Sequence, residues 1–207
     1  MIIAVDGPVA AGKGTLARRI AEKYGFQYLD TGSLYRAVSL LMLREGRDLK
    51  DVNMAAEAAM RVEEISADDP DLRKESTGNA ASVVANNPEV RATLLKYQRD
   101  FARRAPGSVL DGRDIGTVVC PDADLKLYVT ATAEIRARRR FDELIAKGDD
   151  VSFDEILAEL KTRDARDQGR NASPLRKAQD AHLLDTSKLD IEAALKAASV
   201  LIDNRIT

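Results

Sequence analysis

The sequence predicts an α/β fold in which a five-stranded parallel sheet is flanked by helices. Short apolar runs of strand length alternate with longer segments of helical periodicity, which is the pattern of βα units. The chain of 207 residues is long enough for one well-buried domain and short for two independent ones. Hydrophobic residues make up 44% of the chain and charged residues 32%, which is the balance of a folded protein.

The alternation of strands and helices can be followed along the chain. An apolar strand at residues 2–5 precedes a glycine-rich turn and a helix at about 14–24. A second strand and helix follow at 26–29 and 31–44. The remaining strands are expected at 108–110, at 125–130 and, as a last edge strand, at 182–184. The remaining helices are expected after Thr132, at about 152–168 and at about 190–203.

Residues 50–104 are predicted to be mostly helical. The polar stretch 66–78, which carries Asp68, Asp69, Pro70 and Asp71, interrupts this pattern and is expected to be a loop or a small excursion. We therefore expect one domain over residues 1–207. It would contain a helical insertion at about 31–105 and a lid at about 150–175.

Charge and cysteine content bear on the partners and the compartment. Lys and Arg number 32 against 34 Asp and Glu, so no global field attracts nucleic acid or an anionic membrane. The one cysteine, Cys120, cannot form an internal disulfide, and its apolar neighbours favour a packed side chain in a reducing compartment. Neither a signal peptide nor a membrane-spanning run is apparent. We expect a cytoplasmic monomer that acts on small molecules.

Residues 7–13 contain the Gly-x4-Gly-Lys pattern of a P-loop between a predicted strand and a predicted helix. Glycines let backbone N–H groups surround a phosphate, and the positive end of the helix dipole points at it. Lys13 adds a charge for the β- and γ-phosphates of ATP. The consensus places Ser or Thr where Gly14 stands, so direct ligation of Mg²⁺ by Thr15 stays open. The residues expected to contact ATP are Gly7, Pro8, Val9, Ala10, Ala11, Gly12, Lys13, Gly14 and Thr15.

Three further clusters of charged residues bear on the phosphate acceptor. Residues 29–36 and 110–116 follow predicted strands, at the carboxyl edge of the sheet where ligands of open α/β folds bind. In the third cluster, Arg163, Arg166 and Arg170 would share one helix face if the helix continues to Arg170. An exposed helix face with weak ion pairs is the alternative for this cluster. Beside a P-loop, the arginines favour neutralisation of two nucleotides.

Together these motifs resemble bacterial cytidylate kinases, which belong to the P-loop nucleoside monophosphate kinases. The resemblance covers most of the chain. It rests on the P-loop and on the motifs Leu-Asp-Thr-Gly-x-x-Tyr-Arg at 29–36, Asn-Ala-Ala-Ser at 79–82, Val-Arg at 90–91, Asp-Gly-Arg-Asp-Ile-Gly-Thr at 111–117 and the Arg/Asp run at 163–170. It implies a P-loop NTPase fold, a monophosphate-binding insertion, and transfer of the γ-phosphate of ATP to CMP or dCMP with Mg²⁺.

The resemblance also implies roles for individual residues. The acceptor phosphate would be held by Arg36, Arg113 and Arg170, the base would be read by Ser82, Arg91 and Asp114, the sugar would contact Arg163 and Asp167, and Thr31 and Tyr35 would line the pocket. The catalytic set would be Lys13, Arg113, Arg163 and Arg170, Mg²⁺ waters would be held by Asp111, and ATP would lie against Arg136 and Arg140. Arg138 and Arg139 share that helix, so the choice among these four arginines stays open.

The assignment of Asp114 to recognition of the cytosine base is chemically reasonable. Cytosine presents an amino group at N4, which a carboxylate can accept, whereas uracil presents an oxygen that would be repelled. The acceptor phosphate has a second pKa of about 6 and is largely ionised at neutral pH. No general base is therefore needed, and the single histidine, His182, is expected to be structural.

Other activities need different features. A kinase for another small acceptor, such as UMP, AMP, dTMP or shikimate, stays open, because a P-loop says nothing about the acceptor. A nucleotide-dependent switch of the small GTPase kind would need an Asp-x-x-Gly motif and an Asn-Lys-x-Asp motif. The sequence contains neither.

Overall fold

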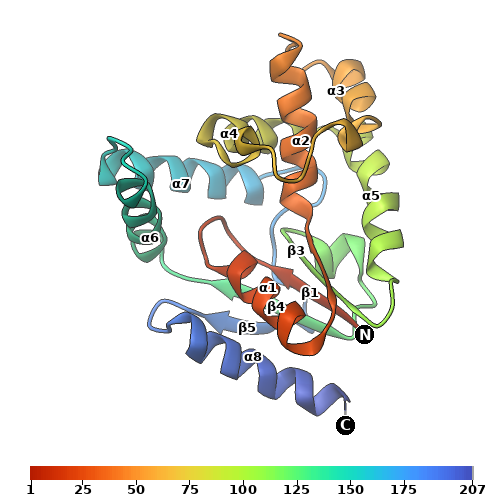
Figure 1. The fold of residues 1–207 in the computed structure, drawn as a ribbon, viewed down its shortest axis with the longest axis vertical. Helices are drawn as coiled ribbons and strands as arrows, with labels where there is room; N and C mark the ends of the chain where they lie inside the picture. Colours follow the sequence, from red (N-terminus) through yellow and green to blue (C-terminus); the bar gives the residue numbers. More distant parts are fainter. Residues whose placement is uncertain (207) are drawn as a thin grey trace. The chain divides into compact units, whose positions relative to one another are not determined.

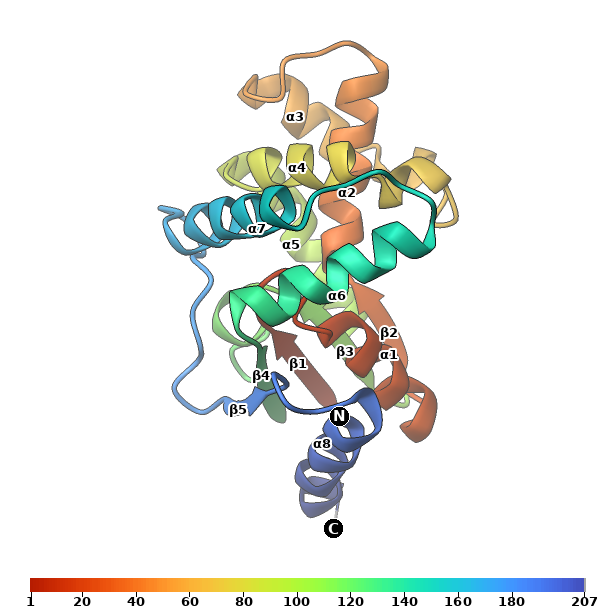
Figure 2. The ribbon, with the colours of Figure 1, turned by 90° about the vertical axis from the view of Figure 1, so that its left-hand side faces the viewer.

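A computed structural model describes residues 1–206 (Figures 1 and 2). The chain forms two compact units, each described by itself below. The sheet unit comprises Met1–Leu29 and the chain from Ala102 onwards, and the helical unit comprises Asp30–Phe101. Within the described residues, no helix combines the length and the apolar character needed to cross a lipid bilayer.

The sheet unit is built on a five-stranded sheet, as the sequence predicts. Its strands are β1 (Ile2–Asp6), β2 (Gln27–Asp30), β3 (Ser108–Gly112), β4 (Leu125–Thr130) and β5 (His182–Asp185), in the order β2-β3-β1-β4-β5. β1 lies at the centre and pairs in parallel with β3 and β4, and β4 pairs in parallel with β5. The register places Asp6 opposite Gly112, so these two strands end together.

Consecutive residues of β1 and β3 are buried, so these central strands are covered on both faces, as is usual in parallel sheets. One core cluster joins Ile3 and Val5 of β1 to α1 (Lys13–Tyr24) and α8 (Ile191–Ile206). A second cluster, which includes Ala137 and Leu160, packs α6 (Ala133–Ala146) against α7 (Phe153–Gln168). The side chain of Thr132 accepts a hydrogen bond from Ile135 N at 3.3 Å and so begins α6 where the sequence predicts a helix start.

Two details of the elements differ from the predictions. Residues 115–119 form a single π-helical turn, η3 (Ile115–Val119), which the sequence did not indicate. The predicted break at 66–78 is shorter, because α4 begins at Glu75 after the 3₁₀ turns η1 (Val62–Glu64) and η2 (Pro70–Arg73). α7 ends at Gln168, as the sequence predicts, so the condition under which Arg170 would share a helix face with Arg163 and Arg166 is not met.

The helical unit contains α2 (Thr31–Arg44), α3 (Val52–Ala59), α4 (Glu75–Val84) and most of α5 (Pro88–Ala102). Val38 and Met42 of α2, Val84 of α4 and Leu94 of α5 are almost fully buried in one apolar cluster. The helices of this unit are therefore held by a core of their own. Asp30 caps α2 by accepting a hydrogen bond from Ser33 N at 3.3 Å.

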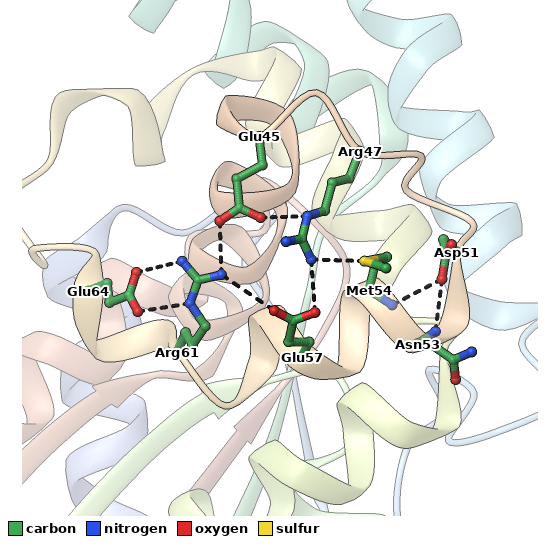
Figure 3. A network of polar contacts seen from close by, with 8 residues as sticks. All are labelled: Glu45, Arg47, Asp51, Asn53, Met54, Glu57, Arg61 and Glu64. Carbon is green, nitrogen blue, oxygen red and sulfur yellow. Dashed lines mark hydrogen bonds and ion pairs between the residues drawn. The ribbon is translucent and has the colours of Figure 1, made fainter.

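A network of ion pairs joins the end of α2 to α3 and η1 within the helical unit (Figure 3). Arg61 contacts Glu64 at 2.8 Å and Glu45 at 2.9 Å, and Arg47 contacts Glu45 at 2.6 Å and Glu57 at 3.1 Å. The hydrogen bonds that Arg61 donates to Glu64 and Glu45 raise its pKa. These groups are partly exposed, so each pair stabilises the unit only modestly.

Candidate active site

The predicted phosphate-binding loop, residues 7–13, connects β1 to α1 in the sheet unit. A Cβ atom on Gly7 would lie 1.9 Å from the carbonyl oxygen of Val129, so only glycine fits there. Ala10 and Gly12 have positive φ angles of 58° and 83°, which turn the backbone before α1 begins at Lys13. The first turn of α1 carries no acidic side chain, and its N–H groups can receive an anion.

The structure gives a reason for Gly14, which departs from the P-loop consensus. A Cβ atom at this position would lie 2.9 Å from Oδ2 of Asp111, a buried carboxylate at the end of β3. Oδ1 of Asp111 also lies 3.6 Å from Nζ of Lys13. Gly14 therefore makes room for a carboxylate beside the P-loop lysine.

Oxygen donors near the loop fit the Mg²⁺ that accompanies ATP. Thr15 is exposed in the first turn of α1, and Asp111 is buried close to Lys13. Hydroxyl, carboxylate and water oxygens suit Mg²⁺, which usually keeps several waters and binds through few protein groups. No cluster of three or more His, Cys, Asp or Glu side chains within residues 1–206 could hold a metal ion alone. Phosphate oxygens would have to complete the coordination.

The four arginines of α6 have distinct surroundings. Arg136 is buried and donates to Ala131 O at 3.0 Å, to Val9 O at 3.1 Å and to both carboxylate oxygens of Asp164 at 3.2 and 2.6 Å. It therefore contacts the phosphate-binding loop and α7 at once. The other three arginines have different partners. Arg138 lies over the rings of Phe141 and Phe153, Arg139 donates to Thr186, and Arg140 pairs with Glu143.

Three of the predicted site arginines gather around Asp167 in the sheet unit. Oδ2 of Asp167 accepts from Nε of Arg113 at 2.9 Å, and Oδ1 accepts from Nη2 of Arg170 at 2.5 Å. Burial alone would raise the pKa of Asp167, but the positive charges of Arg113, Arg170 and Arg163 outweigh it, so the pKa lies below its usual value. A buried carboxylate thus holds several guanidinium groups together.

Asp114 is buried at the start of η3. Its carbonyl oxygen accepts from Val118 N at 2.9 Å and Val119 N at 3.2 Å. The next two amides, of Ile115 and Gly116, donate to Oδ1 and Oδ2 of Asp6, each at 2.8 Å. Burial raises the pKa of Asp6 to about 7, partly offset by those two amides.

The remaining predicted acceptor residues belong to the helical unit. The side chain of Arg36 donates to Leu72 O at 2.9 Å, and the guanidinium of Arg91 lies 5.6 Å from the ring centre of Tyr35. Thr31, Tyr35 and Ser82 are buried. The hydroxyl of Ser82 has no hydrogen-bond partner among the described residues, which is unusual for a buried polar group.

Comparison with known proteins identifies the family. A family model described as cytidylate kinase matches residues 3–203. The chain belongs to the cytidylate kinase family. It is 57% identical over 205 residues to cytidylate kinases of Brucella suis biovar 1 and of Brucella ovis, matches that cover 99% of this chain and 94% of each relative.

Solved structures are similar in fold. A protein described as uncharacterised from Eubacterium ventriosum ATCC 27560 matches with a TM-score of 0.56 at 16% identity, over 98% of both chains. A sugar kinase from Janibacter sp. HTCC2649 matches with a TM-score of 0.52 at 14% identity, over 97% of this chain and 93% of that one. At these identities the matches bear on the fold alone.

Three residues near the phosphate-binding loop of this cytidylate kinase make contacts that were not predicted from the sequence. The hydroxyl of Thr186, directly after β5, lies 3.1 Å from both Ala11 O and Thr130 O, which share its single hydrogen, and it accepts from Arg139 at 3.1 Å. Asp164 and Asp6 anchor Arg136 and the start of η3. The position of Asp6 directly before Gly7 was the one available signal, whereas the contacts of Thr186 and Asp164 depend on chain segments far away in sequence.

Two residues outside the site can be placed as well. His182 is exposed at the start of the edge strand β5. Cys120 is 3% exposed and is not in a disulfide, which agrees with the expectation of a packed side chain.

Proposed function

We propose that this cytidylate kinase transfers the γ-phosphate of ATP to CMP, giving CDP and ADP, and that it also uses dCMP. The observation that carries the proposal is the gathering of Arg113, Arg163 and Arg170 around Asp167 in the same unit as the P-loop. A kinase that brings two nucleotides together must neutralise several phosphate charges, and such an arginine cluster can do so. Its relatives from Brucella are named cytidylate kinases, which favours CMP over other acceptors.

On the acceptor side, we assign the phosphate to Arg36, Arg113 and Arg170. A guanidinium group carries five N–H donors, so it can contact a carboxylate and a phosphate together. Asp167 would then fix the orientation of Arg113 and Arg170 before CMP arrives, which lowers the cost of ordering them on binding.

The cytosine base is assigned to Ser82, Arg91 and Asp114. The buried hydroxyl of Ser82, without a hydrogen-bond partner in residues 1–206, supports a role toward a ligand. A carboxylate at Asp114 would accept the N4 amino group of cytosine and repel O4 of uracil. We further assign contacts with the sugar to Arg163 and Asp167, and the lining of the pocket to Thr31 and Tyr35.

On the donor side, residues 7–15 would hold the phosphates of ATP, with Lys13 at the β- and γ-phosphates. Arg136 and Arg140 are assigned to the adenine and phosphates of ATP, and the contact of Arg136 with Val9 O places it next to the loop. Mg²⁺, held through Thr15 and waters on Asp111, would supply positive charge to the β- and γ-phosphates.

The reaction needs alignment and charge neutralisation more than proton transfer. The CMP phosphate is already largely ionised at neutral pH, since its second pKa is about 6. Lys13, Arg113, Arg163 and Arg170 would therefore act by orienting the two phosphates and by stabilising charge on the transferred group. We assign a lid role to residues 150–175, whose closure would exclude water, and the binding of the monophosphate to the insertion at 31–105. We propose that the enzyme acts as a monomer in the cytoplasm.

The test is an ADP-release assay with ATP, Mg²⁺ and CMP, dCMP, UMP, AMP, dTMP or shikimate in turn. We expect the highest kcat/KM for CMP, turnover of dCMP, weak turnover of UMP and little of the others. Lys13→Ala serves as the control for contaminating kinases and should abolish the signal. Comparable kcat/KM for AMP or shikimate would refute the assignment of the acceptor.

A further inference from the structure

The carboxylate of Asp6 joins the end of β1 to the segment that carries Arg113 and Asp114. Asp6 is only 5% exposed and is followed directly by Gly7, the first residue of the phosphate-binding loop. Its two oxygens accept from the amides of Ile115 and Gly116, each at 2.8 Å. One buried side chain thus contacts the backbone of two consecutive residues in the segment that follows β3.

These contacts fix both ends of a very short stretch. On one side, Gly112 is the last residue of β3 and lies opposite Asp6 in the β1–β3 register. On the other side, the amides of Ile115 and Gly116 are held by the carboxylate of Asp6. The two residues between these anchors are Arg113 and Asp114, so their Cα positions are determined relative to the start of the phosphate-binding loop.

The local backbone needs this support. Residues 115–119 form a π-helical turn, which is rare and is frequently associated with functional sites. Asp114, whose φ and ψ angles are −143° and 24°, directly precedes that turn. Two hydrogen bonds from consecutive amides to one buried carboxyl group hold such a turn in place, because a buried donor left without a partner is costly.

We propose that Asp6 is a positioning residue for acceptor selection, which acts through Ile115 and Gly116 to hold Asp114 at the cytosine base. The inference rests on the proposed base-reading role of Asp114. Asp6 itself does not touch the substrate. Its role is to set where the reading carboxylate stands relative to the loop that binds ATP, so that discrimination between CMP and UMP depends on both aspartates.

The first test compares kcat/KM for CMP and UMP in Asp6→Asn, Asp114→Ala and the double variant. Asparagine offers one acceptor oxygen, and its NH₂ group would face a backbone N–H, so one of the two anchoring bonds is lost. We expect the CMP to UMP ratio to fall about tenfold in Asp6→Asn, since misplacement by about 1 Å can cost up to a hundredfold. We expect Asp114→Ala to lower the ratio at least as much, and the double variant to match Asp114→Ala alone, because coupled residues are not additive.

A matched control is available at the other end of β1. Asp124 is exposed and its carboxylate accepts from Ile2 N at 2.6 Å, so Asp124→Asn makes the same chemical change to a carboxylate that supports the same strand. This variant should keep the wild-type ratio. A second variant, Gly116→Ala, perturbs the backbone that Asp6 holds, because its Cβ would lie 3.0 Å from Cδ of Lys126, which must shift, and would also touch Oδ2 of Asp6 at 3.4 Å. It should lower the ratio even if Asp6→Asn does not fold.

The outcomes separate the two claims. If Asp114→Ala lowers the CMP to UMP ratio while Asp6→Asn and Gly116→Ala leave it at the wild-type value, Asp6 has no part in selection and the inference alone fails. A ratio unchanged in Asp114→Ala would remove the base-reading role and the inference with it. Independent, additive losses in the double variant would likewise show that Asp6 does not act through Asp114.

Discussion

The buried ion pair between Arg136 and Asp164 allows the sharpest prediction about stability. Arg136 is 4% exposed, and both oxygens of Asp164 accept from its guanidinium at 2.6 and 3.2 Å. In Asp164→Ala the guanidinium keeps its hydrogen bonds to Ala131 O and Val9 O but loses the opposite charge. A buried charge is then left without compensation, which is costly.

The expected loss follows from the burial of the two partners. Removing one partner of a buried pair typically costs about 3–5 kcal/mol. The Asp164 side chain is 16% exposed, so solvent screens the pair in part and we take the lower end of that range, about 3 kcal/mol. In a protein of this size, that loss lowers Tm by about 6–12 °C, since each kcal/mol shifts it by about 2–4 °C.

Urea and thermal unfolding of the ligand-free protein, followed by circular dichroism, measure this loss directly. Glu143→Ala is the matched control on the same helix, because Glu143 pairs with Arg140 at 2.9 Å but its side chain is 48% exposed. That variant should stay within about 1 kcal/mol of the wild type. A free energy of unfolding for Asp164→Ala within the same margin would refute the view that this pair is a buried, essential contact.

Three further predictions follow from the site. Gly7→Ala should weaken ATP binding at least about tenfold, because the new Cβ would lie 1.9 Å from the carbonyl of Val129; an unchanged Kd in calorimetry would contradict this. Burial raises the pKa of Asp6 from 3.8 to about 7, so the unfolded chain releases this proton first as pH rises. The free energy of unfolding is thus highest below about pH 4, as far as Asp6 is concerned, and falls by up to about 4 kcal/mol by pH 7. Asp6→Asn should remove this dependence of the free energy of unfolding on pH. Parallel plots of that free energy against pH for the variant and the wild type would argue against the raised pKa. Arg170→Ala should lower kcat about 100- to 1,000-fold with an unchanged circular dichroism spectrum, and near-normal turnover would exclude Arg170 from the acceptor site.

Local patterns were enough to predict the sheet and the glycine-rich turn between β1 and α1. The strands of the sheet are short apolar runs, and the helices carry their periodicity within a single segment. The loop depends on glycines and one lysine in a fixed spacing, and its geometry follows from β1 and α1 on either side. Thr132 begins α6 because a side-chain cap acts over three residues.

Features that depend on distant contacts could not be predicted in this way. The β-branched side chains of Ile115, Thr117 and Val118 are typical of strands, yet these residues form the π-helical turn η3. The amide of Ile115, at the start of this turn, bonds to Asp6, which is 109 residues away in the sequence. The start of α4 at Glu75 could not be predicted either, since Gly78 locally disfavours a helix. A Cβ atom on Gly78 would lie 3.2 Å from the guanidinium of Arg36, so this glycine leaves space for a side chain from α2.

The most direct test of the account is a crystal structure with CMP and a non-hydrolysable ATP analogue bound with Mg²⁺. The account predicts that the guanidinium groups of Arg36, Arg113 and Arg170 contact the phosphate of CMP, with Lys13 at the β- and γ-phosphates of the analogue. If CMP binds with these three arginines directed into solvent, the proposed acceptor site is wrong.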